Sequence, residues 1–410
     1  PIGPPQVNES YLNVDAILSA AKTAGVEAIH PGYGLLSENP GFAQAVTDAG
    51  ITWVGPAPET MRLLADKHVA RDIASAADVP VLPGSAKFDG RDVVDPAGHD
   101  LGAAAAAVGF PLLVKATGGG GGIGMQVCTE PGKLAKLVES VSGLAERAFG
   151  DPGLFLERYV ERAHHVEVQV FGFGNGEVVH LFDRECSVQR RFQKVIEEAP
   201  APCLSPSLRE RLTQAACRLA SAQNYVSAGT VEFVYDEGRE EFYFLEMNTR
   251  IQVEHPVTEC ITGEDLVARQ LKFALGLDDA GRAPVAQTYS GHAIECRIYA
   301  ENPAKKFFPS PGPLEVYELP EADERIRVDT GFAAGDTITP FYDPLIAKLI
   351  TRGEDRAEAI DVMRQALDAT RIEGVRNNAA YLRRIMDHPA FVAGNTDTRF
   401  IERHHNQLQD

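Results

Sequence analysis

The stretch that decides the fold of this 410-residue chain is EMNTRIQVE, residues 246–254. Polar and apolar residues alternate strictly along it, and successive side chains of an extended strand point to opposite faces. The alternation therefore predicts one strand whose polar face carries Glu246, Asn248, Arg250, Gln252 and Glu254. Two carboxylates and a guanidinium on one face could hold a metal, an anion and a proton acceptor in order. The alternative is a strand whose polar face meets only water, and motifs elsewhere decide between the two.

The composition is that of a globular protein with about three domains. Hydrophobic residues make up 44% and charged residues 24% of the chain, which is ordinary for such proteins. The formal net charge is −19. A field of that sign repels nucleic-acid backbones and anionic membrane surfaces, which argues against both as partners. An anionic ligand must therefore be held by a local cluster of donors.

The cysteines and the chain ends bear on localisation. The six cysteines form no CxxC pair and no Cys/His group, which favours reduced thiols over a zinc or disulfide scaffold. We find no apolar run long enough to span a bilayer and no signal-peptide pattern. We therefore expect a cytoplasmic protein. Because the first residue is Pro1, we expect the natural chain to begin earlier.

Periodicity predicts three regions of secondary structure. Helical and strand-like segments alternate along residues 13–65, which is the rhythm of a doubly wound α/β layer. Its expected helices are 14–24 and 40–49, its strands are 26–30 and 51–54, and one helical connection covers 59–77. Next come strands 111–116, 125–128 and 154–159, helices 101–108, 134–149, 208–223 and 264–275, and hairpins 166–182 and 230–246. Residues 291–405 predict a last α+β module.

A glycine loop joins two of these strands. Residues 115–124 read KATGGGGGIG. Glycines let backbone N–H groups approach phosphate oxygens closely. No GxxxxGK[ST] is present, so the run is not a P-loop. The apolar strands on both sides and the preceding Lys115 favour a phosphate-covering loop, Gly118–Gly122, over a plain glycine linker.

The hairpin 230–246 predicts a metal site. If its turn centres on residues 238 and 239, the hairpin places Glu232 and Glu246 near one another, because paired strands bring opposed Cβ atoms within roughly 5 Å. Two carboxylates that close repel unless a cation lies between them. Mg²⁺ takes oxygen ligands from one or two carboxylates plus phosphates and waters, and Asn248 adds a neutral oxygen. The alternative is a surface hairpin with scattered acids, as we expect for Asp236, Glu237 and Glu240.

Several motifs carry a family resemblance. They are HPGYGLLSEN (30–39), Lys115 with its glycines, HVE (165–167), ECSVQRRFQK (185–194), EMNTRIQVEHPVTE (246–259), GHAIECR (291–297) and YDPLIAK (342–348). Together they resemble biotin carboxylase, an ATP-grasp enzyme, over essentially the whole chain. The resemblance implies a mixed α+β and α/β fold. Its parts are a partial Rossmann-like N-terminal domain (1–54), a helical linker (55–81), an ATP-grasp lid with a mobile glycine loop (82–160), an ATP-grasp core (161–280) and a C-terminal α+β domain (281–410).

The resemblance also implies a reaction and its site. ATP and bicarbonate would form carboxyphosphate, which carboxylates biotin on a carrier protein. ATP would be held by Lys67, Lys115, Gly118, Gly119, Gly120, Gly121, Gly122, Glu157, Arg158, Tyr159, Val160, His165 and Gln189. Two Mg²⁺, or Mn²⁺, would bind Glu232, Glu246 and Asn248. Bicarbonate and biotin would be held by Lys194, Arg250, Gln252, Val253, Arg297, Tyr33, Gly34 and Glu38. The catalytic set would be Lys194, Arg250, Arg297 and Glu254, with Glu254 taking the bicarbonate proton and Arg297 stabilising the biotin enolate.

The chain departs from the family pattern in three places. It lacks the usual opening strand, which bears on the dimer that members form. Ile123 replaces a basic residue of the glycine loop, and Phe192 stands where many members carry a polar group. A chain with these departures could be a catalytically silent nucleotide-binding scaffold. It could also be another ATP-grasp ligase, such as carbamoyl-phosphate synthetase or a purine-pathway carboxylase, although these lack residues 250–256 combined with a distant Glu295-Cys296-Arg297.

The resemblance finally implies partners. The chain has no Met-Lys-Met biotin-attachment motif and no carboxyltransferase, so the expected partners are a biotin carboxyl carrier and a carboxyltransferase subunit. We also expect a homo-oligomer within a carboxylase complex. Residues 395–401 favour an acyl-CoA carboxylase alpha subunit, hence fatty acid metabolism, over pyruvate carboxylase. The acyl-CoA acceptor stays open.

Overall fold

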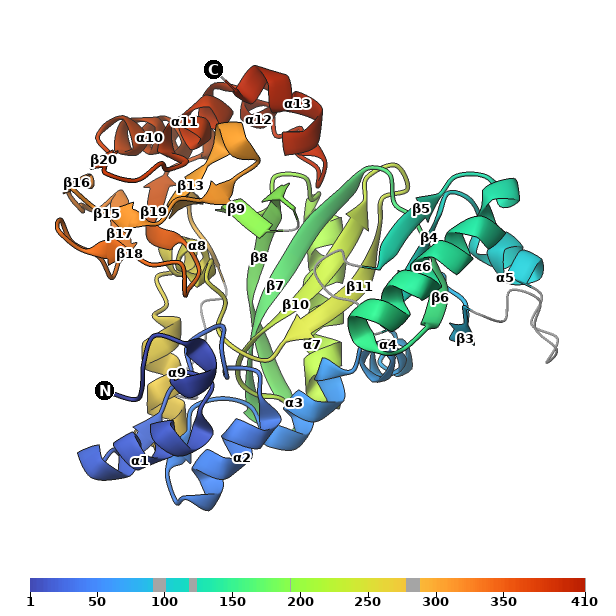
Figure 1. Cartoon of the computed structure of the whole chain (residues 1–410), viewed down its shortest axis with the longest axis horizontal. Helices are drawn as coiled ribbons and strands as arrows, with labels where there is room; N and C mark the ends of the chain where they lie inside the picture. Colours follow the sequence, from blue (N-terminus) through green and yellow to red (C-terminus); the bar gives the residue numbers. More distant parts are fainter. Residues whose placement is uncertain (91–100, 118–123, 192, 278–287, 410) are drawn as a thin grey trace.

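Three bodies make up the computed structural model, which describes residues 1–90, 101–117, 124–191, 193–277 and 288–409 (Figure 1). They are a small N-terminal layer, a four-stranded lid and a large sheet covered by helices. The mixture of helix and sheet confirms the predicted α+β class. The cysteines at all six positions are free thiols. Among the described residues, no helix is both long enough and apolar enough to cross a membrane.

The N-terminal layer is smaller than expected. Its elements are η1 (Val7–Glu9), α1 (Val14–Ala24), β1 (Ala28–Ile29), α2 (Pro40–Asp48) and β2 (Thr52–Trp53). β1 and β2 pair in parallel over only two residues each, so the predicted strands 26–30 and 51–54 were too long. Helix α2 begins where Asn39 accepts a hydrogen bond from the Phe42 amide and Pro40 fits the first turn.

The single helical connection predicted over residues 59–77 is wrong, because two helices are present. They are α3 (Pro58–Ala65) and α4 (Lys67–Ala76). Asp66 separates them: its backbone is extended, and its carboxylate accepts hydrogen bonds from the amides of His68 and Val69. A capping aspartate therefore ends one helix and starts the next. The break places Lys67 in the first turn of α4.

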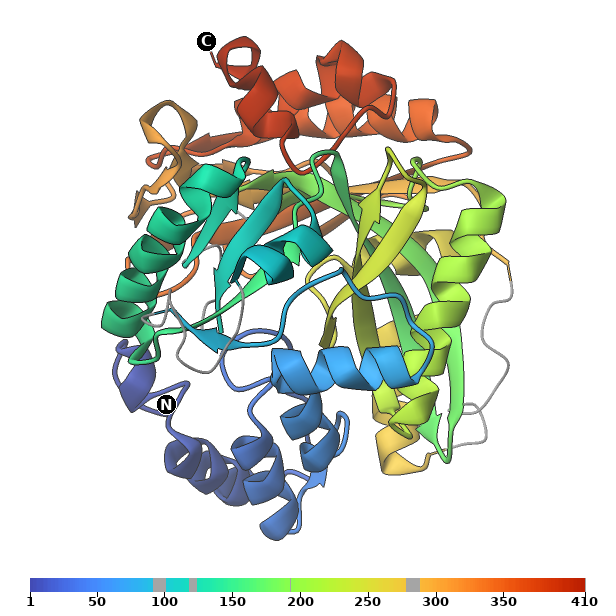
Figure 2. The same ribbon diagram turned by 90° about the vertical axis from the view of Figure 1, so that its right-hand side faces the viewer.

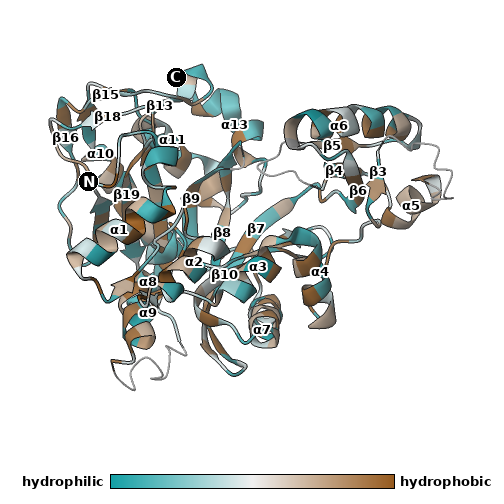
Figure 3. Cartoon of the chain, turned by 60° about the horizontal axis from the view of Figure 1, so that its bottom comes forward, coloured by the Kyte–Doolittle hydropathy of each residue, from teal (hydrophilic) through white to brown (hydrophobic). Residues whose placement is uncertain are grey.

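The lid is a separate body with its own core. It contains β3 (Phe88–Asp89), α5 (Leu101–Val108), β4 (Leu112–Ala116), β5 (Met125–Cys128), η2 (Pro131–Lys133), α6 (Leu134–Phe149) and β6 (Gly153–Arg158). The strand order is β3-β6-β4-β5, and every pair is antiparallel. Figure 3 shows the lid standing to one side of the remaining chain, with α5 and α6 beside its strands. The predicted glycine loop Gly118–Gly122 and Ile123 lie outside the described residues.

One eight-stranded sheet forms the body of the protein, in the order β11-β10-β7-β8-β9-β12-β19-β17. Its strands are β7 (Ala163–Gly174), β8 (Glu177–Arg190), β9 (Gln193–Ala199), β10 (Val226–Asp236), β11 (Glu241–Asn248), β12 (His292–Tyr299), β17 (Ile326–Thr330) and β19 (Leu345–Gly353). Helices α7 (Pro206–Ala222), α8 (His255–Thr262) and α9 (Leu266–Leu275) pack beside it. Both predicted hairpins are present, and β12 continues the sheet into the C-terminal module by pairing with β9.

The C-terminal module covers the far end of that sheet. Its remaining strands are β13 (Glu301–Asn302), β14 (Phe308–Pro309), β15 (Gly312–Pro313), β16 (Val316–Glu318), β18 (Thr337–Ile338) and β20 (Arg371–Glu373). Its helices are η4 (Pro303–Lys305), α10 (Arg356–Asp368), α11 (Ala379–Asp387), α12 (Pro389–Val392) and α13 (Phe400–Leu408). Figure 2 shows these C-terminal helices as one layer along the edge of the molecule. Their buried side chains share a core with β12 and β19.

Candidate active site

A cavity of about 1730 Å3 opens between the lid, the large sheet and the C-terminal module. Most of the predicted site residues line it: Tyr33, Gly34, Lys67, Lys115, Glu157, Arg158, Tyr159, Val160, His165, Gln189, Lys194, Glu232, Glu246, Asn248, Arg250, Gln252, Val253 and Arg297. Glu38 and Glu254 do not line it but contact residues that do. The structure thus brings together side chains from segments more than 200 residues apart.

The predicted strand over residues 246–254 is wrong beyond Asn248. Strand β11 ends there, the chain bends, and helix α8 starts at His255 with Pro256 in its first turn. Proline is favoured at that helix position, so Pro256 was the signal that the alternation concealed. Polar side chains still converge: Gln252 Nε2 donates to Glu232 Oε1 at 2.8 Å, and Arg250 Nη2 donates to Asn248 Oδ1 at 2.9 Å. A turn brings these groups together in place of a strand face.

Glu232 and Glu246, which the predicted hairpin places near one another, pair directly across β10 and β11. The register between the turn and these residues shifts at a β-bulge, because Phe233 pairs with Phe244 and leaves Leu245 extra. Without that extra residue Glu246 would not face Glu232. Burial and the charge of Glu232 raise the pKa of Glu246 above its ordinary value. The pair therefore fits the metal prediction, since a divalent cation would relieve that repulsion.

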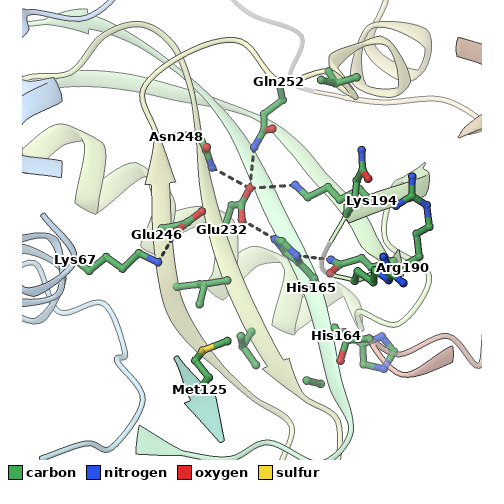
Figure 4. Close-up of a pocket in the computed structure, with 18 of the residues that line it drawn as sticks. Lys67, Met125, His164, His165, Arg190, Lys194, Glu232, Glu246, Asn248 and Gln252 are labelled. Atoms are coloured by element: carbon green, nitrogen blue, oxygen red, sulfur yellow. Dashed lines mark hydrogen bonds and ion pairs between the residues drawn. The ribbon is translucent and has the colours of Figure 1, made fainter. Parts of the chain in front are cut away.

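Lys194 on β9 is the electrostatic centre of the site. Its Nζ lies 2.6 Å from Glu167 Oε2, 2.7 Å from Glu254 Oε1 and 3.1 Å from Glu232 Oε1. Burial alone would lower the pKa of Lys194, but these three carboxylates outweigh burial and raise it well above the ordinary value. Lys194 is therefore a fixed cation facing the cavity. Figure 4 shows it pointing at Glu232 from the side opposite Asn248.

Arg297 on β12 supplies a second fixed cation. Its Nη2 lies 2.6 Å from Glu197 Oε1 and 3.0 Å from Glu254 Oε2. Glu254 is fully buried, and each of its oxygens is paired with a cation: Oε1 with Lys194 and Oε2 with Arg297. Burial would raise the pKa of Glu254, but Lys194 and Arg297 outweigh burial and lower it far below the ordinary value. In this state Glu254 is a weak proton acceptor that lies behind Lys194 and Arg297.

Arg250 forms a third cationic group near the N-terminal layer. Its Nε lies 3.0 Å from Glu38 Oε2, and the other Glu38 oxygen accepts a hydrogen bond from the Thr249 amide at 3.2 Å. Arg250 also donates to Gln252 Oε1 at 3.3 Å. Glu38 therefore fixes the bend after β11 and orients the guanidinium of Arg250. The neighbouring Val253 contributes its carbonyl to Lys348 Nζ at 2.6 Å.

The predicted nucleotide residues gather where the lid meets the sheet. Lys115 Nζ lies 2.6 Å from Glu157 Oε2, and Lys67 Nζ lies 3.7 Å from Glu246 Oε2. On β7, His165 lies 2.7 Å from Glu232 Oε2 and 2.7 Å from the Gln189 amide. Burial would lower the pKa of His165, but the Glu232 carboxylate outweighs burial and raises it. Arg158, Tyr159 and Val160 line the cavity at and just after the end of β6.

Several charged groups of the site were not predicted as site residues. They are Arg71, Glu167, Arg184, Glu197, Glu295 and Lys348. Burial raises the pKa of Glu197 to about 8 and that of Glu295 to about 7. Glu167 and Glu295 each stand between apolar residues in a strand interior, where a charge is rarely buried without a partner. That position was the available signal for these two.

Comparison with known proteins gives three family matches. The model for the biotin carboxylase N-terminal domain matches residues 1–61, and the model for the biotin carboxylase C-terminal domain matches residues 295–403. Between them, the model for the carbamoyl-phosphate synthase L chain ATP-binding domain matches residues 66–279.

Similar proteins cover nearly the whole chain. A biotin carboxylase of Halalkalibacterium halodurans is 48% identical over 408 residues, which are 98% of this chain and 87% of that protein. The alpha subunit of the mitochondrial methylcrotonoyl-CoA carboxylase of Mus musculus is 45% identical over 99% of this chain, which spans 56% of that protein. Among solved structures, the biotin carboxylase domain of Hydrogenobacter thermophilus 2-oxoglutarate carboxylase, in complex with MgADP, ADP and bicarbonate, superposes with a TM-score of 0.88 at 40% identity, covering 100% of this chain and 88% of that one. The chain belongs to the biotin carboxylase family.

Proposed function

We propose that this chain carboxylates biotin on a carrier protein, using ATP and bicarbonate by way of carboxyphosphate. One observation carries the proposal: Lys194, Arg250 and Arg297 meet at one cavity beside the opposed carboxylates Glu232 and Glu246. Three cations can bind bicarbonate and a developing enolate, while the carboxylate pair can hold the metal of MgATP. Few reactions need both kinds of site within one cavity.

ATP binding would use the lid and the sheet together. Lys115 and Lys67 both line the cavity, and each lies beside a glutamate that a phosphate can replace. Glu232, Glu246 and Asn248 would hold Mg²⁺ or Mn²⁺, which neutralises charge between the β- and γ-phosphates. The glycine loop would cover the phosphates and keep water from carboxyphosphate.

Bicarbonate would bind beside Gln252 and Lys194, which both contact Glu232, and beside Arg250, which donates to Gln252. A planar guanidinium suits a carboxylate-like anion, and bicarbonate must be aligned beside the γ-phosphate because it is a poor nucleophile. Glu254 would take its proton. An anion that draws Lys194 away from Glu254 would raise the pKa of Glu254, since Lys194 is the largest of the charges that lower it.

Biotin would be carboxylated beside Arg297. The ureido nitrogen is almost non-basic, and a fixed cation next to the ureido oxygen favours the enolate. Arg297 suits that role because Glu197 and Glu254 hold it from behind while it still lines the cavity. Tyr33 and Gly34 line the same cavity from the N-terminal layer, and Glu38 orients Arg250 there.

The proposal also includes partner proteins. Relatives are subunits of carboxylases, including the alpha subunit of methylcrotonoyl-CoA carboxylase and a subunit of the pyruvate carboxylase of Methanothermobacter thermautotrophicus. A biotin carboxyl carrier, a carboxyltransferase and a second copy of this chain are the partners we propose, within an acyl-CoA carboxylase. We also propose a cytoplasmic location, which the six free thiols support.

The test is ADP release with bicarbonate and free biotin both present, then with each omitted. We expect release to require bicarbonate and to rise when biotin is added. Turnover that ignores both would overturn the proposal and favour another ATP-grasp ligase. Nucleotide binding without any turnover would favour the silent scaffold.

A further inference from the structure

A second cluster of ligating side chains lies beside the active site. His164 on β7, Glu185 on β8 and Cys203 in the turn after β9 place one ligand atom each within 4.8 Å of one another. Val166 pairs with Glu185 across the two strands, so His164 is the diagonal neighbour of Glu185 on the same face. In Figure 4, His164 points away from Glu232 while its neighbour His165 points toward it. The cluster is thus distinct from the Glu232–Glu246 pair.

Two of the ligand atoms converge on the third, Glu185 Oε2. Cys203 Sγ donates to Glu185 Oε2 at 2.8 Å, and His164 Nδ1 lies 3.3 Å from the same oxygen. His164 is 3% exposed, yet its Nδ1 makes no hydrogen bond of acceptable geometry to any described residue. Nδ1 therefore lies within ion-pair distance of Glu185 Oε2 but not at a hydrogen-bonding angle, which leaves its lone pair free for a ligand shared with Glu185.

Other groups lie behind His164 and Glu185. His164 Nε2 lies 3.8 Å from Glu237 Oε2, on the side away from the cluster. The second oxygen of Glu185 accepts hydrogen bonds from the amide and the hydroxyl of Ser187. Metal-binding histidines commonly direct their other ring nitrogen at a carboxylate, and metal-binding carboxylates are themselves hydrogen-bonded. Glu185 has its hydrogen bonds from Ser187, and Glu237 stands near the other nitrogen of His164 at ion-pair distance.

We propose that His164 Nδ1, Glu185 Oε2 and Cys203 Sγ form a binding site for one Zn²⁺. One nitrogen, one carboxylate oxygen and one sulfur are a zinc donor set, and three protein ligands leave a fourth tetrahedral position for water. The sulfur excludes Mg²⁺ and Ca²⁺, which take oxygen ligands. Binding replaces the thiol proton of Cys203, which passes to solvent, by a Zn–S bond. His164 lines the large cavity, which gives the ion a path from solvent. The bound ion would tie the turn at residues 202–203 to β7 and β8.

The experiment uses Co²⁺ and Zn²⁺ on the purified chain in excess Mg²⁺, which keeps the carboxylate pair occupied. A thiolate ligand gives Co²⁺ a near-ultraviolet charge-transfer band that oxygen and nitrogen ligands do not give. The variants are Cys203→Ser and His164→Gln, and the matched control is Cys217→Ser, a partly buried thiol on α7. Zn²⁺ stoichiometry is measured by equilibrium dialysis of the same proteins.

We expect one Zn²⁺ per wild-type chain and a charge-transfer band that Zn²⁺ removes. The band should disappear in Cys203→Ser, at least tenfold more Co²⁺ should be needed in His164→Gln, and the control should match wild type. Absence of the band in wild type, or its survival in Cys203→Ser, would show that the three side chains only contact one another and would overturn the proposal. Zn²⁺ binding that both variants retain would place the ion on other histidines, with the same consequence. If Cys203→Ser does not fold, wild type and His164→Gln still decide the question.

Discussion

Replacing Lys194 by methionine should destabilise the protein more than any exposed charge deletion. Lys194 holds three buried carboxylates, and removing one partner of a buried ion pair costs about 3–5 kcal/mol. Each carboxylate keeps a second cation, namely Arg184 for Glu167, His165 for Glu232 and Arg297 for Glu254. The free energy of unfolding should therefore fall by an amount near the lower limit, about 3 kcal/mol, which is about a hundredfold in the folding equilibrium constant.

The measurement is urea unfolding followed by circular dichroism, without nucleotide or Mg²⁺. Lys133→Met is the matched control, because Lys133 pairs with Glu130 at 2.9 Å while both side chains are more than 60% exposed. Such a pair contributes about 1 kcal/mol or less. The pKa of Glu254 is lowered, so its stabilising effect is present above its ordinary pKa of 4.5 and is lost as the pH falls below it. The difference in the free energy of unfolding between wild type and Lys194→Met should therefore become smaller in acid. A loss no larger than that of the control would refute this account of the site.

Three further variants test the biotin reaction, a buried ion pair of the scaffold and the metal site, in that order. Arg297→Ala should lower biotin-dependent ADP release at least about a hundredfold while nucleotide affinity stays near that of wild type; a large loss of nucleotide binding would contradict the proposed role. Glu198→Gln should lower the free energy of unfolding by about 3 kcal/mol at pH 7. Burial alone would raise the pKa of Glu198, but Arg356 and His292 outweigh burial and lower this pKa from 4.5 to about 2. That difference should vanish in urea titrations as the pH falls from 4.5 to 2, and a pH-independent difference would contradict the ion-pair explanation. Glu246→Gln should raise the Mg²⁺ concentration for half-maximal ADP release about tenfold, whereas Glu241→Gln, exposed on the same strand, should leave it unchanged.

The sequence predicted local elements well wherever helix ends carry a chemical signal. Helix α1 matches its expected bounds, with Asn13 capping its start and Gly25 ending it at a φ of 64°. Helices α5 and α6 and strand β5 also match. The break at Asp66 was missed because the apolar periodicity continues across it. The pairing of β9 with β12 was missed for another reason: residues about 100 positions apart pair through the whole fold, which no local pattern encodes.

The family resemblance is confirmed by the matches over residues 1–61, 66–279 and 295–403, and the reaction that it implies is the function proposed above. The individual residue roles and the domain boundaries stay predictions. The glycine loop and Phe192 lie outside the described residues, so the effect of Ile123 also stays a prediction.

The active site shows why a correct set of residues can come from a wrong local structure. Alternation selects every second residue, and a strand would have spread those five side chains along its length. In the fold, β11 stops at Asn248, and the bend returns Gln252 to Glu232 and Glu254 to Lys194. A bend concentrates the donors around one point, which a straight strand cannot do. The cations at that point are already paired with buried glutamates. A bicarbonate ion must therefore compete with carboxylates of the protein itself, and the net charge of −19 adds nothing to its attraction.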